Sequence, residues 1–180
     1  MSNIRVTYAG LISLAIRLSS IITGLIFVLI TTRELTQNEF GTWGVISGIF
    51  IYAIAIHPTI TYWATREIAR GEETGKTVFL SSSMFSIVGI LIYVGVALFV
   101  SFESDAELGI LLFAVILVPM IFLNDSLTSI ALGSKPQVIS YGFLSFEVSK
   151  ILLAFLFVYF MQMGLEGAIL ATFGAYIPSI

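Results

Sequence analysis

Arg17 occupies the position in this sequence that most specifically suggests chemistry. It lies in the middle of an apolar stretch, with Ser13 four residues before it and Ser20 three residues after it. These three positions share one face of a helix. A charge at the centre of a bilayer costs about 2.5–3.5 kcal/mol on insertion scales, so it normally faces a protein interior or a watery cavity. We expect Arg17 to line a cavity and face a substrate; the alternative is an arginine that fixes helix packing.

Glu147 and Lys150 are a second pair of charged residues inside an apolar stretch. They lie three residues apart, a spacing that places them on one helical face and within reach of each other. Counted from the ends of their segments, Arg17 and Glu147 both lie roughly 14 Å deep. We therefore hypothesise that Arg17 and Glu147 contact each other across two helices. Glu147 and Lys150 are predicted to line a cavity or, alternatively, to neutralise each other.

Asn124 and Asp125 follow Pro119 in another apolar segment, which the proline is expected to kink. They are predicted either to line an inner vestibule or to contact headgroup water at a helix end. His57 precedes Pro58, and a lone histidine in such a segment is expected to be packed and hydrogen-bonded rather than to relay protons.

Six apolar segments position these side chains and fill nearly the whole chain. Of the residues, 58% are hydrophobic, against about 45–50% in a soluble domain. The segments are apolar on every face, which favours helices over a barrel. We therefore predict an all-α, polytopic transmembrane helical bundle of six spans, a single transmembrane domain over residues 1–180. The predicted spans are Tyr8–Thr31, Gly41–Trp63, Val78–Phe102, Leu108–Leu132, Val138–Gln162 and Gly164–Ile180.

Composition excludes several functions. The chain has no cysteine and one histidine, so thiolate zinc sites, Fe–S clusters and disulfides are excluded, and we expect no metal and no cofactor. A net charge of −3 without any basic run gives no sign of a nucleic-acid partner. No nucleophile–base signature appears, and no loop is long enough for a sugar-nucleotide site. We therefore expect no catalytic residues and no enzyme activity. The first apolar stretch is too long for a signal peptide, so we expect it to stay in the mature protein.

Lysine and arginine are distributed unequally between the two sets of loops. Five lie on the side of the N-terminus and one, Arg33, lies on the other; the five are Arg5, Arg66, Arg70, Lys76 and Lys135. Positive charge favours the cytoplasmic side. The sequence therefore predicts that the N-terminus, the Ala64–Thr77 loop and the Gly133–Gln137 loop are cytoplasmic. Six spans would place the C-terminus there as well.

Four short motifs carry a family resemblance that extends over nearly the whole chain. In order they are Thr32–Gly41, Ala64–Gly71, Ala131–Pro136 and Gly164–Ala171. Together they resemble the N-terminal half of a prokaryotic polysaccharide (O-antigen type) flippase, in the multidrug/oligosaccharidyl-lipid/polysaccharide exporter superfamily.

The resemblance implies one lobe of a two-lobe exporter in the cytoplasmic membrane, working by alternating access. Its implied substrate is a lipid-linked oligosaccharide, whose pyrophosphate Arg17 would bind, moved from the cytoplasmic to the outer leaflet. Membrane lipid and a missing second lobe, or a second copy, are the implied partners. The sixth segment ends at Ile180 without a polar flank, so we expect it to be cut off there; the alternative is a short but complete sixth helix. Full members of the family have about twice as many spans. Relatives often carry glycine where this chain has His57-Pro58.

Two other functions stay open at this point. A cation-coupled drug or small-molecule exporter of the same superfamily would need carboxylates tuned for proton or sodium binding, for which Asp125 and Glu147 are the candidates. A membrane protein fragment that transports nothing is the other alternative.

The charge bias predicts the sidedness of the loops, and the cysteine-free sequence makes this easy to measure. A cysteine placed at Glu73 should resist an impermeant thiol reagent added outside intact cells, whereas one placed at Glu166 should react. Labelling of the Glu73 cysteine from outside would overturn the predicted orientation.

Overall fold

The computed structural model describes the backbone of residues 6–104 and 106–180; the side chains of residues 1–13, 16, 17, 105 and 137 lie outside the description. Within the described residues every regular element is helical, which confirms the all-α part of the predicted fold class. The α-helices are α1 Val6–Glu34, α2 Gln37–Ala53, α3 His57–Ala69, α4 Gly75–Glu103, α5 Leu108–Phe113, α6 Leu117–Ser134, α7 Gln137–Ala154 and α8 Gly164–Tyr176. Three short helical turns complete them: η1 Ala114–Ile116, η2 Phe155–Phe160 and η3 Ile177–Ser179.

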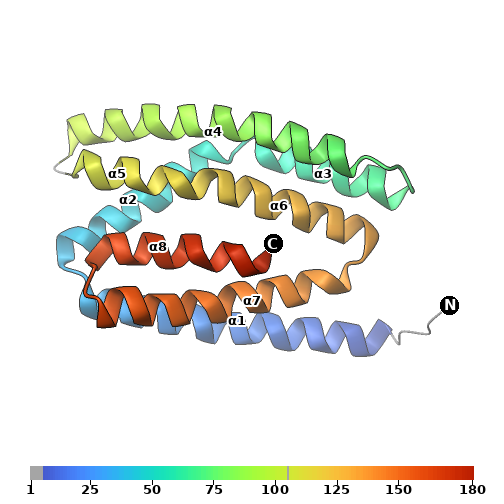
Figure 1. Ribbon diagram of the computed structural model, residues 1–180, viewed down its shortest axis with the longest axis horizontal. Helices are drawn as coiled ribbons and strands as arrows, with labels where there is room; N and C mark the ends of the chain where they lie inside the picture. Colours follow the sequence, from blue (N-terminus) through green and yellow to red (C-terminus); the bar gives the residue numbers. More distant parts are fainter. Residues whose placement is uncertain (1–5, 105) are drawn as a thin grey trace.

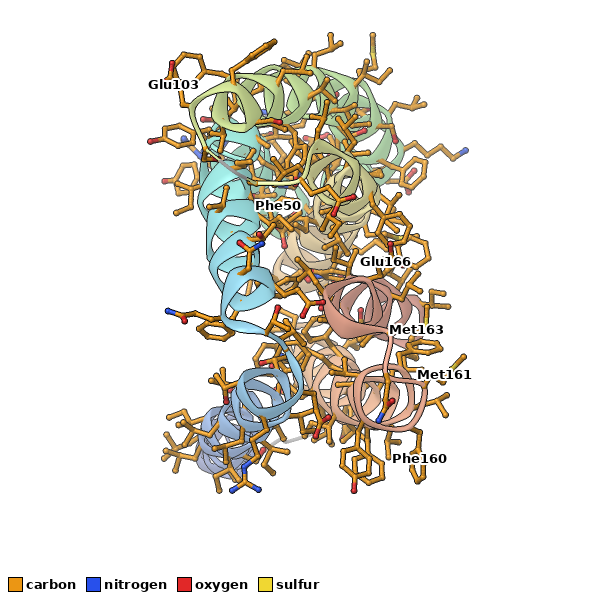
Figure 2. The ribbon with its side chains drawn as sticks, turned by 90° about the vertical axis from the view of Figure 1, so that its left-hand side faces the viewer. Phe50, Glu103, Phe160, Met161, Met163 and Glu166 are labelled. Atoms are coloured by element: carbon orange, nitrogen blue, oxygen red, sulfur yellow. The ribbon has the colours of Figure 1, made fainter. Side chains whose placement is uncertain are left out.

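The helices run side by side along the length of the molecule (Figure 1). Helices α3, α4 and α6 form one group and α1, α7 and α8 another, and α2 passes between them. The α3–α4 and α6–α7 turns share one end of the bundle with the start of α1, while the α1–α2, α4–α5 and α7–α8 turns share the other. Figure 2 looks along the bundle from this second end, which carries Glu103 and Glu166, with Phe50 in the interior.

Three stretches of the described chain are long and apolar enough to cross a membrane, which suggests a membrane protein: Gly75–Glu103, Leu108–Ser134 and Val138–Phe160. Helices α2 and α3 count as a fourth only if they form one broken span, because they meet at an angle of 55°. Helix α1 has 29 residues, but many of its side chains lie outside the described set.

The predicted number of six spans is therefore not supported. The expected second span, Gly41–Trp63, is interrupted after Ala53, because Pro58 has no N–H to continue the helical hydrogen bonds from Ile54. The expected sixth span consists of α8, with 13 residues, and η3, with three. At 1.5 Å per residue these reach about 24 Å, less than the roughly 30 Å of a hydrocarbon core. Near Pro119, where a kink is expected, the 3₁₀ turn η1 interrupts the α-helix, and Leu108–Ser134 still counts as one span.

A capping box joins the beginnings of α2 and α8. The Thr36 hydroxyl accepts a hydrogen bond from the Glu39 backbone N–H (3.3 Å), and the Thr36 N–H donates to Glu39 Oε2 (2.8 Å). The other carboxylate oxygen of Glu39 accepts from the backbone N–H of Leu165 (3.2 Å). Gly164 has φ +55°, and a Cβ there would collide with the Glu39 carboxylate. Glycine at 164 thus lets one glutamate cap two helices.

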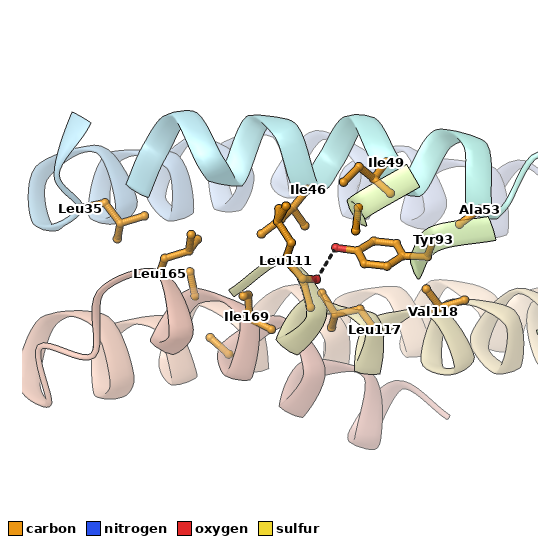
Figure 3. Close-up of a cluster of buried hydrophobic side chains, with 14 of the residues drawn as sticks. Leu35, Ile46, Ile49, Ala53, Tyr93, Leu111, Leu117, Val118, Leu165 and Ile169 are labelled. Atoms are coloured by element: carbon orange, nitrogen blue, oxygen red, sulfur yellow. Dashed lines mark hydrogen bonds between the residues drawn. The ribbon is translucent and has the colours of Figure 1, made fainter. Parts of the chain in front are cut away.

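The core lies where α2, α4, α5, α6 and α8 converge (Figure 3). The hydroxyl of Tyr93, fully buried, donates to the Leu111 carbonyl (3.0 Å), so α4 and α5 are tied together in the middle of apolar side chains. Gly89 allows α4 to approach its neighbours, because a Cβ there would lie 2.9 Å from the Phe122 ring and 3.0 Å from the Ala53 carbonyl oxygen. The close packing of α4 on α2 and α6 depends on this glycine.

Replacing Gly89 should therefore destabilise the bundle while a matched glycine should not. We expect Gly89→Ala to lower the free energy of unfolding by about 1–3 kcal/mol through overpacking. Gly95→Ala in the same helix should leave it unchanged or raise it, because a Cβ at Gly95 meets no atom within 4 Å. Thermal unfolding in detergent measures both, and equal stability of the two variants would contradict the close approach.

Candidate functional site

Helix α6 separates two cavities, and Asp125 lines both of them. The first has a volume of about 350 Å³ and lies between α6, α7 and the end of α8. The second, about 770 Å³, lies between α3 and α6. Thr128 also lines both, one turn further along α6. The Asp125 side chain is 46% exposed, so its carboxylate is accessible in a bundle that is otherwise largely apolar.

The first cavity combines polar groups with aromatic rings. Asn124 lines it beside Asp125, and the Asn124 Oδ1 accepts a hydrogen bond from the Ser179 hydroxyl (3.2 Å). The rings of Phe146 and Tyr176, which also line it, lie 4.7 Å apart. The structure thus places Asn124 and Asp125 on a cavity wall; that this wall is a vestibule and that they act on a substrate stay predictions.

His57 lines the second cavity, although it is only 1% exposed. Its Nε2 is 2.8 Å from the Ser82 hydroxyl, and its Nδ1 is 3.4 Å from Asp125 Oδ2. The ring also packs against Phe122, with centroids 4.2 Å apart. His57 is therefore packed and hydrogen-bonded, as the sequence indicates, and it joins α3 to α4 and α6.

Asp125, His57 and Ser82 are the residue types of a hydrolase triad, but their surroundings do not suit that chemistry. Ser82 is 2% exposed, and its hydroxyl also contacts the Phe122 carbonyl and the Ser126 hydroxyl. It lies in the middle of α4, where backbone N–H groups are used within the helix and cannot stabilise an oxyanion. The cluster holds three helices together and offers no accessible nucleophile.

Glu147 and Lys150 form the ion pair that their spacing predicts. Lys150 Nζ lies 3.1 Å from Glu147 Oε2, with side chains 14% and 10% exposed. The same carboxylate oxygen accepts a hydrogen bond from the Thr23 hydroxyl of α1 (2.7 Å). Lys150 Nζ also lies over the rings of Phe27 and Phe146, 5.4 and 4.9 Å from their centroids. The pair is thus neutralised and holds α1 against α7, and neither residue lines the two cavities.

Arg17 is predicted to line a cavity, but its side chain lies outside the described set. Its backbone belongs to α1, but its predicted contact with Glu147 lies beyond the description. The partner that the structure shows for Glu147 on this helix is Thr23. The sequence gives no signal that Thr23 contacts Glu147. The two residues are 124 positions apart, and only tertiary packing brings the hydroxyl beside the carboxylate.

The described residues contain no group of three or more histidine, cysteine or acidic side chains that could hold a metal ion. Comparisons with protein-family models, with curated proteins and with solved structures found no match for this chain. Function must therefore be argued from the two cavities and the buried polar groups.

The Glu147–Lys150 pair predicts a specific stability pattern. Glu147→Gln should lower the free energy of unfolding by about 3 kcal/mol, because it leaves the Lys150 ammonium in a mostly buried place without its counter-charge. Adding Lys150→Met should recover most of the loss. The exposed pair of Arg70 and Glu67 (3.1 Å) is the control, and Glu67→Gln should cost less than about 1 kcal/mol. Equal losses in Glu147→Gln and Glu67→Gln, measured by unfolding in detergent, would contradict this.

Proposed function

We propose that this chain is one lobe of a membrane transporter that moves lipid-linked oligosaccharides across the cytoplasmic membrane by alternating access. It lies there as a multi-pass protein with its N-terminus in the cytoplasm. The observation that carries the proposal is the polar wall of α6, with Asn124 and Asp125 exposed to cavities inside an apolar helical bundle. Polar groups at such places mark substrate pathways in membrane proteins.

The lining of the first cavity suits a sugar. Aromatic rings such as Phe143 and Tyr176 offer flat apolar faces, against which the C–H face of a pyranose packs. The Asp125 carboxylate accepts hydrogen bonds from hydroxyls, and the Asn124 amide both donates and accepts. A mostly apolar pocket with few polar groups that fix orientation is the usual form of a small-ligand site.

Breaks in the helices supply the flexibility that alternating access needs. The α2–α3 bend, the 3₁₀ turn η1 and the π-helical turn η2 all interrupt regular helices. The α2–α3 bend lies beside the second cavity, since His57 and Pro58 line it. Irregular backbone beside a cavity is typical of transporters, where it allows one part of the bundle to move against another.

In this proposal Arg17 binds the pyrophosphate of the substrate. Its planar guanidinium matches phosphate oxygens in a way that a lysine ammonium does not. In a site of low dielectric the attraction is far stronger than in water. A second lobe, or a second copy of this chain, supplies the opposite wall of the transport path.

Cation-coupled export of a small molecule is the second candidate function. The observation that favours it is the accessible Asp125 carboxylate beside His57. Glu147 suits it less, because Lys150 and Thr23 already satisfy its carboxylate.

Comparing a lipid-linked oligosaccharide with the same lipid pyrophosphate without sugar separates the contributions of sugar and pyrophosphate to binding. We expect the purified chain in nanodiscs to bind a lipid-linked oligosaccharide, and Arg17→Ala to weaken binding at least about tenfold, with Arg17→Lys between the two. Asn124→Ala and Asp125→Asn should weaken binding of the oligosaccharide but not of the same lipid pyrophosphate without sugar. Arg70→Ala, whose arginine pairs with Glu67, is the control.

Native mass spectrometry measures each complex directly. Binding of both ligands by Arg17→Ala at the wild-type level would contradict the assigned role of the arginine. An unchanged affinity of Asn124→Ala and Asp125→Asn for the oligosaccharide would contradict the assigned sugar site. A wild-type chain that binds neither ligand would overturn the proposed function.

A further inference from the structure

His57 begins α3 at the point where the chain bends by 55° from α2. Side chains from two other helices meet its ring there: Ser82 from α4, and Asp125 and Ser126 from α6, the last with its hydroxyl 3.4 Å from Nε2. This is the only histidine of the sequence. The His57 ring therefore contacts polar groups of two other helices at the break between α2 and α3.

The hydrogen bonds around the ring can accommodate neutral His57. The Asp125 carboxylate has no proton to donate, so the proton of a neutral ring belongs on Nδ1, 3.4 Å from Asp125 Oδ2. Nε2 then accepts from the Ser82 hydroxyl at 2.8 Å. The Ser126 hydroxyl donates to the Phe122 carbonyl at 2.7 Å. Each hydroxyl proton has an acceptor in this state.

The same atoms can also accommodate the doubly protonated ring. Nε2–H then donates to the Ser82 oxygen, and the Ser82 hydroxyl turns its proton to the Phe122 carbonyl, 3.2 Å away. Nδ1–H faces the Asp125 carboxylate, which supplies the opposite charge. No new donor is left unsatisfied, so burial alone does not exclude the charged ring.

We propose that His57 and Asp125 form a proton-binding site, with Ser82 as the hydroxyl that reverses its hydrogen bond when the proton arrives. Binding a proton places a positive charge on the ring 3.4 Å from the Asp125 carboxylate and so strengthens the contact of α3 with α6. The proton site shares Asp125 with the proposed sugar site, but it does not require that function, because its groups are side chains of this chain. It changes the carboxylate that lines both cavities, and so links proton binding to the cavity walls.

Few other titratable groups face this site. From α4 the group that contacts the ring is the neutral Ser82. From α3, Tyr62 and Arg66 line the same cavity, and across α6 Tyr176 lines the first cavity with Asp125. Asp125 is the negative group that contacts the ring, so its removal is the decisive change.

Nuclear magnetic resonance tests the proposal directly, because a chain with one histidine gives one pair of imidazole nitrogen signals. With ¹⁵N-histidine in nanodiscs, the wild-type ring should gain its second proton while the helices remain folded. Asp125→Asn should lower the proton affinity of His57 at least about tenfold, since an opposite charge within 4 Å is lost.

Thr128→Val is the control, since Thr128 lines both cavities without a contact to His57. It should titrate like the wild type. In the wild-type chain, the ¹³C signal of the Asp125 carboxylate should shift with the same midpoint as the His57 nitrogens, which tests the pair without any substitution. A ring that stays neutral at every pH where the helices are folded would overturn the proposal. Equal midpoints in Asp125→Asn and the wild type would overturn it too.

Discussion

Polar groups inside an apolar bundle need partners within the protein, and this constraint organises the structure. Where no water is available, an unpaired buried polar group costs several kcal/mol. Two clusters meet the constraint: His57 with Ser82 and Ser126, and Glu147 with Lys150 and Thr23. The first joins α3 to α4 and α6, and the second joins α1 to α7. Among the described side chains, Thr74 Oγ1 is the buried polar atom without a partner.

The position of α6 follows from the first cluster. Ser126 of this helix contacts the buried histidine, and the neighbouring residues Asn124 and Asp125 line the cavities. The same helix therefore packs on the buried histidine and also carries accessible polar groups, and Asp125 takes part in both roles. The proposed transport path depends on these accessible groups, since a bundle that buried every polar residue would present only apolar walls.

The sequence predicts the helical class and the Glu147–Lys150 pair because both depend on local spacing. It does not predict the number of spans, because apolar content looks the same across the break at Ile54–Ile56 as within a continuous helix. Asn124 and Asp125 could be singled out as polar residues in an apolar segment. The contacts of His57 with Ser82 and Ser126, 25 and 69 residues away, arise from tertiary packing alone. Thr23 was missed for the same reason.

Whether water reaches the α6 wall inside the bundle tests the account most directly. Asn124 lies about 15 Å from the Ser134 end of α6, and Met84 lies about 14 Å from the corresponding end of α4, at 1.5 Å per residue. Met84 is 70% exposed on the outer face, where lipid would cover it. Cysteines at the two positions can be treated with a charged thiol reagent in membranes. We predict that the Asn124 cysteine reacts and the Met84 cysteine does not; an Asn124 cysteine as unreactive as that at Met84 would contradict the account.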